Sequence, residues 1–277
     1  LLTGTGFTNE LFNIFLANSL LKKKKYILVQ HGNAYKTHYE NDFLTETQTC
    51  DYSMTWGIKE KENEIQIFNI KTIRKKKTFN KNGNFSVISH MMSTRPLPFN
   101  SFFYQEKIFK DTILFLEKLP IEFKNKTYFR LFPNEKFNSI LKKEILNKNI
   151  NLYPENISFE KIKNRTKLFM FNYDSTGFYE NLSLNIPTIF FSKDPYYDLK
   201  NEYKEIYENL ENVKIINKNE KVLSAHLNNI WNDPLKWWHN EKTQKAINIF
   251  NENLNIPSEG KLGKIINELK KLEKNIL

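Results

Sequence analysis

Short apolar runs alternate with helical patterns along most of the chain, most clearly over residues 166–191. There an apolar run at 168–171 is followed by a polar turn at 174–177, a helical apolar pattern and a second apolar run at 188–191. Runs this short and rich in aromatic residues are typical of buried strands, whereas Asp, Ser and Thr favour helix starts. We therefore predict a strand–helix–strand unit of parallel sheet, with the turn at the carboxyl ends of the strands, where such sheets bind ligands.

The remaining pattern predicts an α/β fold with doubly wound parallel sheets. We place the domain boundary so that residues 1–77 form the C-terminal part of one domain and residues 78–277 form a second domain with C-terminal helices. Because the chain begins without Met and in mid-pattern, we expect the first domain to be incomplete. Further strands are expected at 26–29, 51–57, 64–70, 85–89, 127–132 and 213–216, and helices at 7–20, 102–119, 136–146, 202–210 and from 220 onward.

Composition narrows the class of protein. The 277 residues carry 42 Lys and Arg against 31 Asp and Glu, a net charge of +11, but the lysines are spread along the whole chain. The dense clusters at 22–25 and 74–77 are expected to be solvated surface, although they could help the protein rest on an anionic membrane face. Cys50 stands alone, and no apolar run approaches the roughly 20 residues that span a bilayer, so we expect a cytoplasmic protein.

The polar turn holds the first candidate site. The hydroxyls of Ser175 and Thr176, with the backbone N–H groups of the helix start, could hold a donor phosphate. The simpler interpretation is that they only cap the helix, and Asp174 is expected to be a cap in either case. Glu180 lies one helical turn beyond Thr176 and could accept hydrogen bonds from a ribose, or could be a solvated surface residue.

Arg130 and His31 are the other candidates that follow a strand. Arg130 should lie at the same sheet edge as Ser175, where a guanidinium could neutralise a leaving phosphate, a surface ion pair being the alternative. His31 could take a proton from an acceptor hydroxyl or donate to a phosphate, although a lone histidine is often structural. It is followed by Gly32, which lets a ligand approach the backbone, and by Tyr35.

Two carboxylates of the first domain, Glu46 and Asp51, complete the candidates. Either could be the general base, or the nucleophile of a retaining reaction, and the sequence does not order them. We predict no metal site, because His38, His90, His226 and His239 lack the mutual spacing of zinc ligands. Trp231, Trp237 and Trp238 are expected to pack the C-terminal helices across the domain junction, with stacking on a sugar or base as the alternative.

Several motifs occur in one order along nearly the whole chain: 30–35 (Gln-His-Gly-Asn-Ala-Tyr), Glu46, 51–57, 130–133 (Arg-Leu-Phe-Pro), 173–180, 185–188, and 226–231 with Trp237-Trp238. Together they resemble a family of predicted transferases encoded in bacterial O-antigen and surface-polysaccharide clusters. That family is in turn similar to GT-B glycosyltransferases, among them CDP-glycerol glycerophosphotransferases and the Kdo and sialic acid transferases of capsule synthesis.

The resemblance implies a GT-B-like protein with two Rossmann-like domains and a helical C-terminal tail. The first domain would be the acceptor side, with His31 facing the cleft, and the second would bind a nucleotide-activated donor through Arg130 and residues 174–180. Where those enzymes carry His-Pro, this chain reads Phe132-Pro133, so Arg130 would take over the contact with the donor phosphate. The resemblance also implies a complete first domain upstream.

The implied function is transfer of a sugar from a nucleotide sugar, for example a CMP-Kdo-like donor, to a surface-polysaccharide or lipid-linked acceptor in lipopolysaccharide or O-antigen assembly. No cofactor or divalent metal is predicted to be required, and peripheral association with the inner membrane is compatible with this role. Glycerophosphate transfer from a CDP-linked donor and a non-catalytic partner subunit stay open as alternatives. A nucleic-acid-binding protein would instead require a continuous basic face with exposed aromatic residues.

Overall fold

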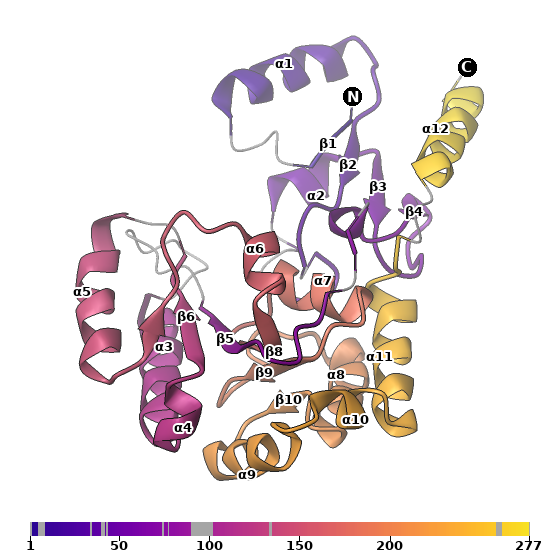
Figure 1. The fold of residues 1–277 in the computed structure, drawn as a ribbon. Coiled ribbons are helices and arrows are strands. Elements are labelled where there is room, and N and C mark those ends of the chain that lie inside the picture. Colours follow the sequence, from indigo (N-terminus) through magenta and orange to yellow (C-terminus); the bar gives the residue numbers. More distant parts are fainter. Residues whose placement is uncertain are drawn as a thin grey trace.

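The computed structural model describes residues 2–4, 9–33, 35–39, 42, 44–73, 75–76, 78–89, 102–132, 135–258 and 262–276. Its strands form two parallel sheets, one of four strands and one of six. Figure 1 shows the smaller sheet above the larger one, with the last helix beside the smaller sheet. We call the part built on the smaller sheet the first unit and the part built on the larger sheet the second unit.

The first unit contains short strands in the order β1-β2-β3-β4. Its elements are β1 (Leu2–Thr3), α1 (Glu10–Leu21), β2 (Ile27–Val29), α2 (Thr45–Thr49), β3 (Tyr52–Thr55), β4 (Glu64–Gln66) and the 3₁₀ turn η3 (Ile70–Thr72). Asn9 begins α1, because its side chain accepts a hydrogen bond from the backbone N–H of Phe12 at 3.2 Å. All strands of this sheet are parallel, so the loop after β2 leaves its carboxyl edge.

The second unit has the strand order β10-β9-β8-β5-β6-β7, all parallel. The strands are β5 (Asn84–Ile88), β6 (Thr127–Arg130), β7 (Asn151–Leu152), β8 (Thr166–Phe171), β9 (Thr188–Phe191) and β10 (Ile216–Asn217). The helices are α3 (Phe102–Glu117), α4 (Ile121–Lys124), α5 (Glu135–Asn147), α6 (Phe159–Lys163), α7 (Thr176–Ser183), α8 (Lys204–Asn212), α9 (Glu220–Ile230), α10 (Pro234–Trp238) and α11 (Glu241–Leu254), with the 3₁₀ turn η4 (Asn201–Tyr203) before α8. The last helix, α12 (Leu262–Ile276), returns to lie beside the smaller sheet.

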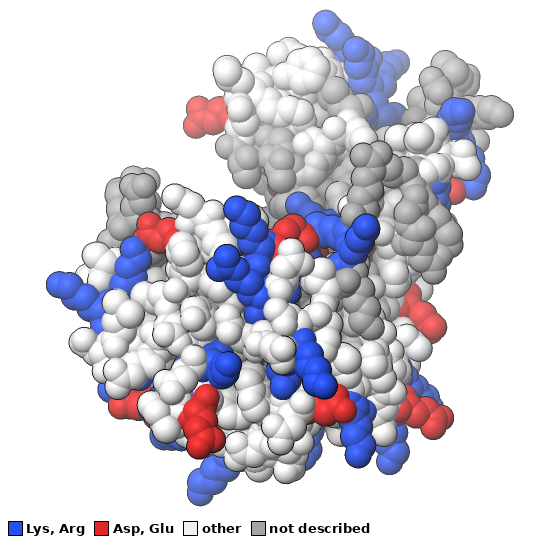
Figure 2. Space-filling view, in the orientation of Figure 1, with Lys and Arg blue, Asp and Glu red and all other residues white. Residues whose placement is uncertain are grey.

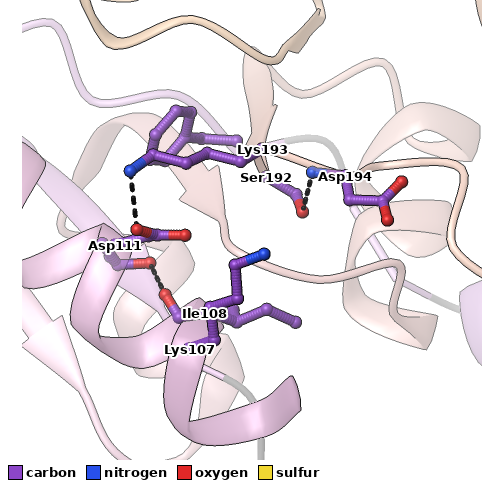
Figure 3. Close-up of a pocket in the computed structure, with 8 residues that line it drawn as sticks. Lys107, Ile108, Asp111, Ser192, Lys193 and Asp194 are labelled. Atoms are coloured by element: carbon purple, nitrogen blue, oxygen red, sulfur yellow. Dashed lines mark hydrogen bonds and ion pairs between the residues drawn. The ribbon is translucent and has the colours of Figure 1, made fainter. Parts of the chain in front are cut away.

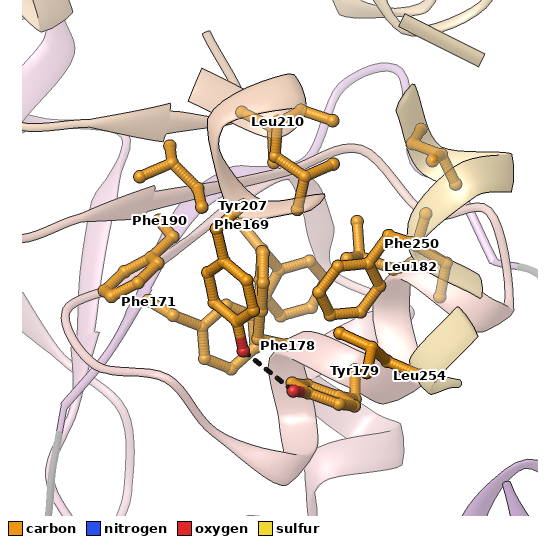
Figure 4. Close-up of a cluster of buried hydrophobic side chains, with 14 of the residues drawn as sticks. Phe169, Phe171, Phe178, Tyr179, Leu182, Phe190, Tyr207, Leu210, Phe250 and Leu254 are labelled. Atoms are coloured by element: carbon orange, nitrogen blue, oxygen red, sulfur yellow. Dashed lines mark hydrogen bonds between the residues drawn. The ribbon is translucent and has the colours of Figure 1, made fainter. Parts of the chain in front are cut away.

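Apolar side chains cover both faces of the second sheet. Along β8, Phe169 and Phe171 belong to one buried cluster, while Leu168 and Met170 belong to another. Alternate residues of a strand point to opposite faces, so a strand buried on both faces reads as a continuous apolar run. Figure 4 shows the first of these clusters, in which aromatic rings of α7, α8 and α11 pack against the strands.

The end of α11 and the residues that follow it, 253–256, join the second unit to the first. The backbone N–H of Ile256 donates to the Trp56 carbonyl at 2.7 Å, and the N–H of Asn69 donates to the Ile256 carbonyl at 2.7 Å. The side chain of Asn255, fully buried, contacts the Asn69 side chain at 2.8 Å and the Tyr179 carbonyl at 2.8 Å. Buried amides with both partners satisfied favour one arrangement of the two units.

The doubly wound fold with parallel sheets and C-terminal helices is confirmed, and several local predictions need correction. The strand expected at 64–70 ends at Gln66, and Ile70 begins a 3₁₀ turn instead. The strand expected at 213–216 lies at Ile216–Asn217, because Lys214 has a positive φ of 64°, which extended strands do not adopt. The short elements α2, α4, α6 and β7 were not predicted, since two to five residues carry too little periodicity.

Basic side chains do not gather into one continuous surface on the face shown in Figure 2, where they alternate with acidic and uncharged groups over both units. Several of them are paired across the surface, as in Lys118 with Glu220 at 2.7 Å. Arg74 and Lys77 of the second basic cluster lie outside the described residues. Within the part of the chain that is described, no helix is long and apolar enough to cross a bilayer.

Candidate functional site

Arg130 lies at the carboxyl edge of the second sheet. Ile88 pairs in register with Arg130 on one side and with Phe171 on the other, so Arg130 and the start of the 172–176 turn lie in one row. The Arg130 Nε is buried and has no hydrogen-bond partner among the described residues. Burial lowers the pKa of Arg130, which shows that its charge is poorly solvated. A half-buried guanidinium with a free N–H donor favours an anionic ligand.

Tyr173 lies between Arg130 and the start of α7. Burial raises the pKa of its phenol, while a hydrogen bond with Ser175 and the charge of Arg130 both act in the opposite direction. The three side chains are therefore close enough to interact at one sheet edge. Pro133, which the resemblance places in the same motif as Arg130, lies outside the described residues.

Ser175 is the N-cap of α7, since its Oγ accepts a hydrogen bond from the backbone N–H of Phe178 at 3.1 Å. The prediction that Asp174 caps this helix is wrong. Its carboxylate instead accepts a hydrogen bond from the Tyr207 hydroxyl at 2.6 Å. Burial raises the pKa of Asp174, although the nearby His38 and the Tyr207 hydroxyl act against this shift. Ser175 caps more effectively because its extended backbone lets the hydroxyl reach the first turn.

Thr176, the first helical residue of α7, contacts the loop that follows β2. The backbone N–H of Asn33 donates to Thr176 Oγ1 at 3.2 Å, and the same hydroxyl lies 3.3 Å from Asn33 Oδ1. A methyl group added at Gly32 would stand only 3.2 Å from Thr176 Oγ1. The structure therefore brings the His31-Gly32 loop of the first unit against the helix start of the second, and a glycine permits the close approach.

His31, Tyr35 and Glu46 form one hydrogen-bonded chain in the first unit. The Tyr35 hydroxyl donates to Glu46 Oε1 at 2.7 Å and lies 2.7 Å from His31 Nδ1. The two rings meet edge to face, with centroids 5.2 Å apart. Burial lowers the pKa of His31, and Lys71 lowers it further, whereas Glu46 and the Gly4 carbonyl raise it. The imidazole is therefore neutral at neutral pH and able to accept a proton.

Asp51 does not join this group. It precedes β3 and lies at the amino edge of the sheet, where its carboxylate accepts hydrogen bonds from Lys25 Nζ and from the backbone N–H of Tyr26, each at 2.8 Å. Burial alone would raise the pKa of Asp51, but these two hydrogen bonds outweigh it and the pKa is lowered. The sequence already contained the signal, because residues before a parallel strand lie opposite the ligand-binding edge.

Glu180 is buried in a cluster of ion pairs and is not a solvated surface residue. Its Oε2 lies 2.6 Å from Lys75 Nζ and 3.5 Å from Lys163 Nζ, and Lys163 is fully buried. Glu160 completes the cluster at 3.2 Å from Lys163. Lys75 comes from the segment between the units, so Glu180 fixes that segment to α7. That Glu180 accepts hydrogen bonds from a ribose stays a prediction.

A second polar contact between the units was not predicted from the sequence. His38 Nε2 lies 3.7 Å from Asp174 Oδ2, and the Tyr207 hydroxyl that donates to Asp174 lies 2.8 Å from the Tyr179 hydroxyl. His38 also forms an antiparallel bridge with Leu199. No pattern could have paired residues so far apart along the chain, because the contact depends on how the units pack.

Among the cavities lined by described residues, one lies beside β9 and another adjoins Tyr35. Figure 3 shows the one beside β9, of about 10 Å³, where Lys193 Nζ lies 2.6 Å from Asp111 Oδ1 and Ser192 Oγ accepts from the backbone N–H of Asp194. It has room for about one water molecule, so it is too small for a nucleotide. The other, of about 120 Å³, lies in the first unit and is lined by Gln30, Tyr35, Lys36, Thr55 and Asn63 among others.

No group of three or more His, Cys, Asp or Glu side chains within the described ranges could hold a metal ion. The contacts that the structure describes for Trp231, Trp237 and Trp238 lie within the second unit, whereas the prediction placed them across the domain junction. The Trp231 ring contacts Phe123, with centroids 4.5 Å apart, and the Trp238 Nε1 donates to Asn185 Oδ1 at 2.6 Å. Tryptophan with its N–H satisfied is typical of a structural role.

The two parallel sheets give the chain a GT-B-like architecture. A family model described as LIC12162 family transferase matches residues 5–269. The chain belongs to this family, which confirms the resemblance to a transferase family. A search of the curated proteins finds no match to the sequence.

A solved structure with a TM-score above 0.5 supports the same fold. The chain is similar to Staphylococcus aureus MnaA in a co-structure with UDP, at 14% identity and a TM-score of 0.52, over 94% of this chain and 71% of that one. It is also similar to the wall teichoic acid polymerase TagF, at 13% identity and a TM-score of 0.47, over 91% and 68% of the two chains. WaaG, a glycosyltransferase involved in lipopolysaccharide biosynthesis, matches at 10% identity and a TM-score of 0.43, over 92% and 81%.

Proposed function

We propose that this protein transfers a sugar from a nucleotide-activated donor to a surface-polysaccharide or lipid-linked acceptor. The donor phosphates would bind at the carboxyl edge of the second sheet, and the acceptor hydroxyl would approach from the side of His31. The observation that carries the proposal is the contact between the units at Thr176. It sets the loop of the imidazole against the helix start at the same sheet edge as Arg130, whose buried Nε has no hydrogen-bond partner among the described residues.

Each part has a chemical task in such a reaction. Arg130 and the backbone N–H groups at the start of α7 would stabilise the negative charge that develops on the departing nucleotide phosphate. His31 would accept the proton of the attacking hydroxyl. Holding donor and acceptor in line between the units would supply the effect of proximity. The proposed reaction requires no metal ion, and we propose that it takes place in the cytoplasm at the inner membrane face, where lipid-linked acceptors are accessible.

The choice of donor can be tested by thermal unfolding with CMP-, CDP-, UDP- and GDP-sugars and with CDP-glycerol. A ligand at about 100 times its Kd stabilises the folded state by about 2.7 kcal/mol, so one class should raise the Tm distinctly. A response to CDP-glycerol alone would favour glycerophosphate transfer, which uses the same phosphate contacts. A response to an oligonucleotide and to no nucleotide sugar would contradict the proposal.

Arg130→Gln should weaken binding of the responding nucleotide about tenfold or more, because a charge-assisted contact to phosphate is lost. The measurement is a calorimetric titration. Arg165→Gln is the matched control, since Arg165 is exposed and precedes β8, at the opposite edge of the same sheet. Equal affinities of the two variants would rule out the donor site at Arg130.

A further inference from the structure

The hydrogen-bonded chain from Glu46 through Tyr35 to His31 fixes where the protons lie. A tyrosine hydroxyl has one hydrogen, and a carboxylate can only accept. The Tyr35 hydroxyl donates that hydrogen to Glu46 Oε1 at 2.7 Å. Toward His31 Nδ1, which lies 2.7 Å away, its oxygen can then only accept. Nδ1 of the neutral ring must therefore carry the hydrogen, and Nε2 holds the free lone pair.

We propose that Tyr35 and Glu46 are positioning residues that hold His31 as the Nδ1–H tautomer, so that Nε2 is the nitrogen that receives the acceptor proton. This inference rests on the transfer reaction proposed above. The O–H bond of the acceptor breaks as an N–H bond forms at Nε2. The acceptor oxygen bonds to the sugar carbon as the bond from that carbon to the donor phosphate breaks, and the electron pair leaves with the nucleotide.

The same chain stabilises the charge that this step creates. An imidazolium formed at His31 keeps its Nδ1–H directed at the Tyr35 oxygen. The negative charge of Glu46 polarises the Tyr35 hydroxyl and so stabilises the imidazolium. The Gly4 carbonyl also favours the protonated ring, whereas Lys71 opposes it. Glu46 does not need to take the proton, just as the buried aspartate of a Ser-His-Asp triad orients its histidine without becoming protonated. The proposal therefore removes Glu46 from the candidates for nucleophile.

The direct test is the ¹⁵N resonance pattern of His31 in the uniformly labelled full chain, assigned by its loss in His31→Asn. The wild-type protein above the imidazole pKa should show a protonated Nδ1 and an unprotonated Nε2. Tyr35→Phe should lose this preference, and Glu46→Gln should keep it, because the amide oxygen still accepts from Tyr35. Tyr39→Phe is the control, since Tyr39 is an exposed tyrosine of the same loop and should leave the tautomer unchanged.

Turnover measurements complete the test. Tyr35→Phe and Glu46→Gln should each lower kcat about 10- to 100-fold with little change in KM for the donor, and Tyr39→Phe should lower neither. An Nε2–H tautomer in the wild-type protein, or the same tautomer in Tyr35→Phe, would overturn the inference. The tautomer is measured without substrate, so a wrong tautomer can be told apart from a wrong function. If the proposed function fails, the resonance pattern will be as stated but no nucleotide sugar will be consumed. Full turnover in His31→Asn with the stated pattern would also reject the catalytic assignment.

Discussion

The two units differ in how they are stabilised. The second sheet is covered on both faces by large clusters of buried apolar residues. Within the described residues of the first unit, the buried members of a separate cluster are Leu16, Tyr26 and Leu28. Other buried residues of that unit, Met54 and Trp56 among them, belong to the cluster that contains α7, α8 and α11.

This difference has a consequence for the site. The proposed donor side is built on a sheet whose strands are fixed by their own packing, whereas the unit that carries His31 is held in place largely by packing onto its neighbour. Helix α1 even leaves Leu11, Ile14, Phe15 and Leu21 exposed. We therefore expect the distance between His31 and the start of α7 to depend on side chains at the junction of the units, far more than on the local sequence around either group.

The largest effect should come from Trp56→Ala, because Trp56 is fully buried in the shared cluster. We expect the free energy of unfolding to fall by about 3–5 kcal/mol, measured by urea denaturation. Leu21→Ala is the control from the same unit, with 83% of its side chain exposed, and should change the free energy by no more than about 0.5 kcal/mol. Similar losses in the two variants would show that the first unit is stable without its neighbour.

Acid should lower the free energy of unfolding through the second unit, because this unit contains a buried neutral histidine. Burial, with a contribution from Lys214, lowers the pKa of His226 from its ordinary 6.5 to about 4. The unfolded chain therefore binds a proton below pH 6.5 that the folded chain binds only near pH 4. The contribution of neutral His226 to the free energy of unfolding is fully present above pH 6.5. It is lost as the pH falls toward 4, by up to about 3 kcal/mol.

The check is the slope of unfolding free energy against pH between about 6.5 and 5, a range in which histidine dominates the titration. His226→Gln should flatten the slope, while His239→Gln, whose side chain is exposed, should not. A slope unchanged in His226→Gln would mean that another group carries the acid sensitivity. The acid sensitivity of the second unit could then no longer be assigned to His226.

A smaller loss of stability is expected from a substitution where residues 253–256 join the two units. A methyl group added at Gly57 would lie 2.9 Å from Leu254 Cα and would also press on the Asn253 carbonyl. Gly57→Ala should therefore cost about 1–3 kcal/mol of unfolding free energy, because backbone cannot move aside as a flexible side chain can. Gly263→Ala, in α12 with no atom within 4 Å of the added methyl, should be neutral or stabilising by up to about 1 kcal/mol. Denaturation of both variants under one condition separates the two cases.

The sequence predicted the elements with strong patterns because those residues are buried locally. The apolar runs around β8 and β9 and the Asp-Ser-Thr turn between them predicted the strand–helix–strand unit, and the structure confirms it. The rule that strand ends define the ligand edge also placed Arg130 beside Ser175 correctly, through their common neighbour Tyr173. Asp51 was misjudged because its carboxylate was weighed without its position before a strand.

The sequence by itself therefore determined the α/β order, the sheet edges and the residue types available for anion binding and proton transfer. Only the tertiary structure decided that Ser175 caps α7, that Glu180 pairs with Lys75 and Lys163, and that Asn33 reaches Thr176 across 143 positions of sequence. The physical reason is the range of the interactions. Periodicity and capping act within a few residues, whereas ion clusters, hydrogen bonds between units and packing depend on which distant surfaces exclude water from one another.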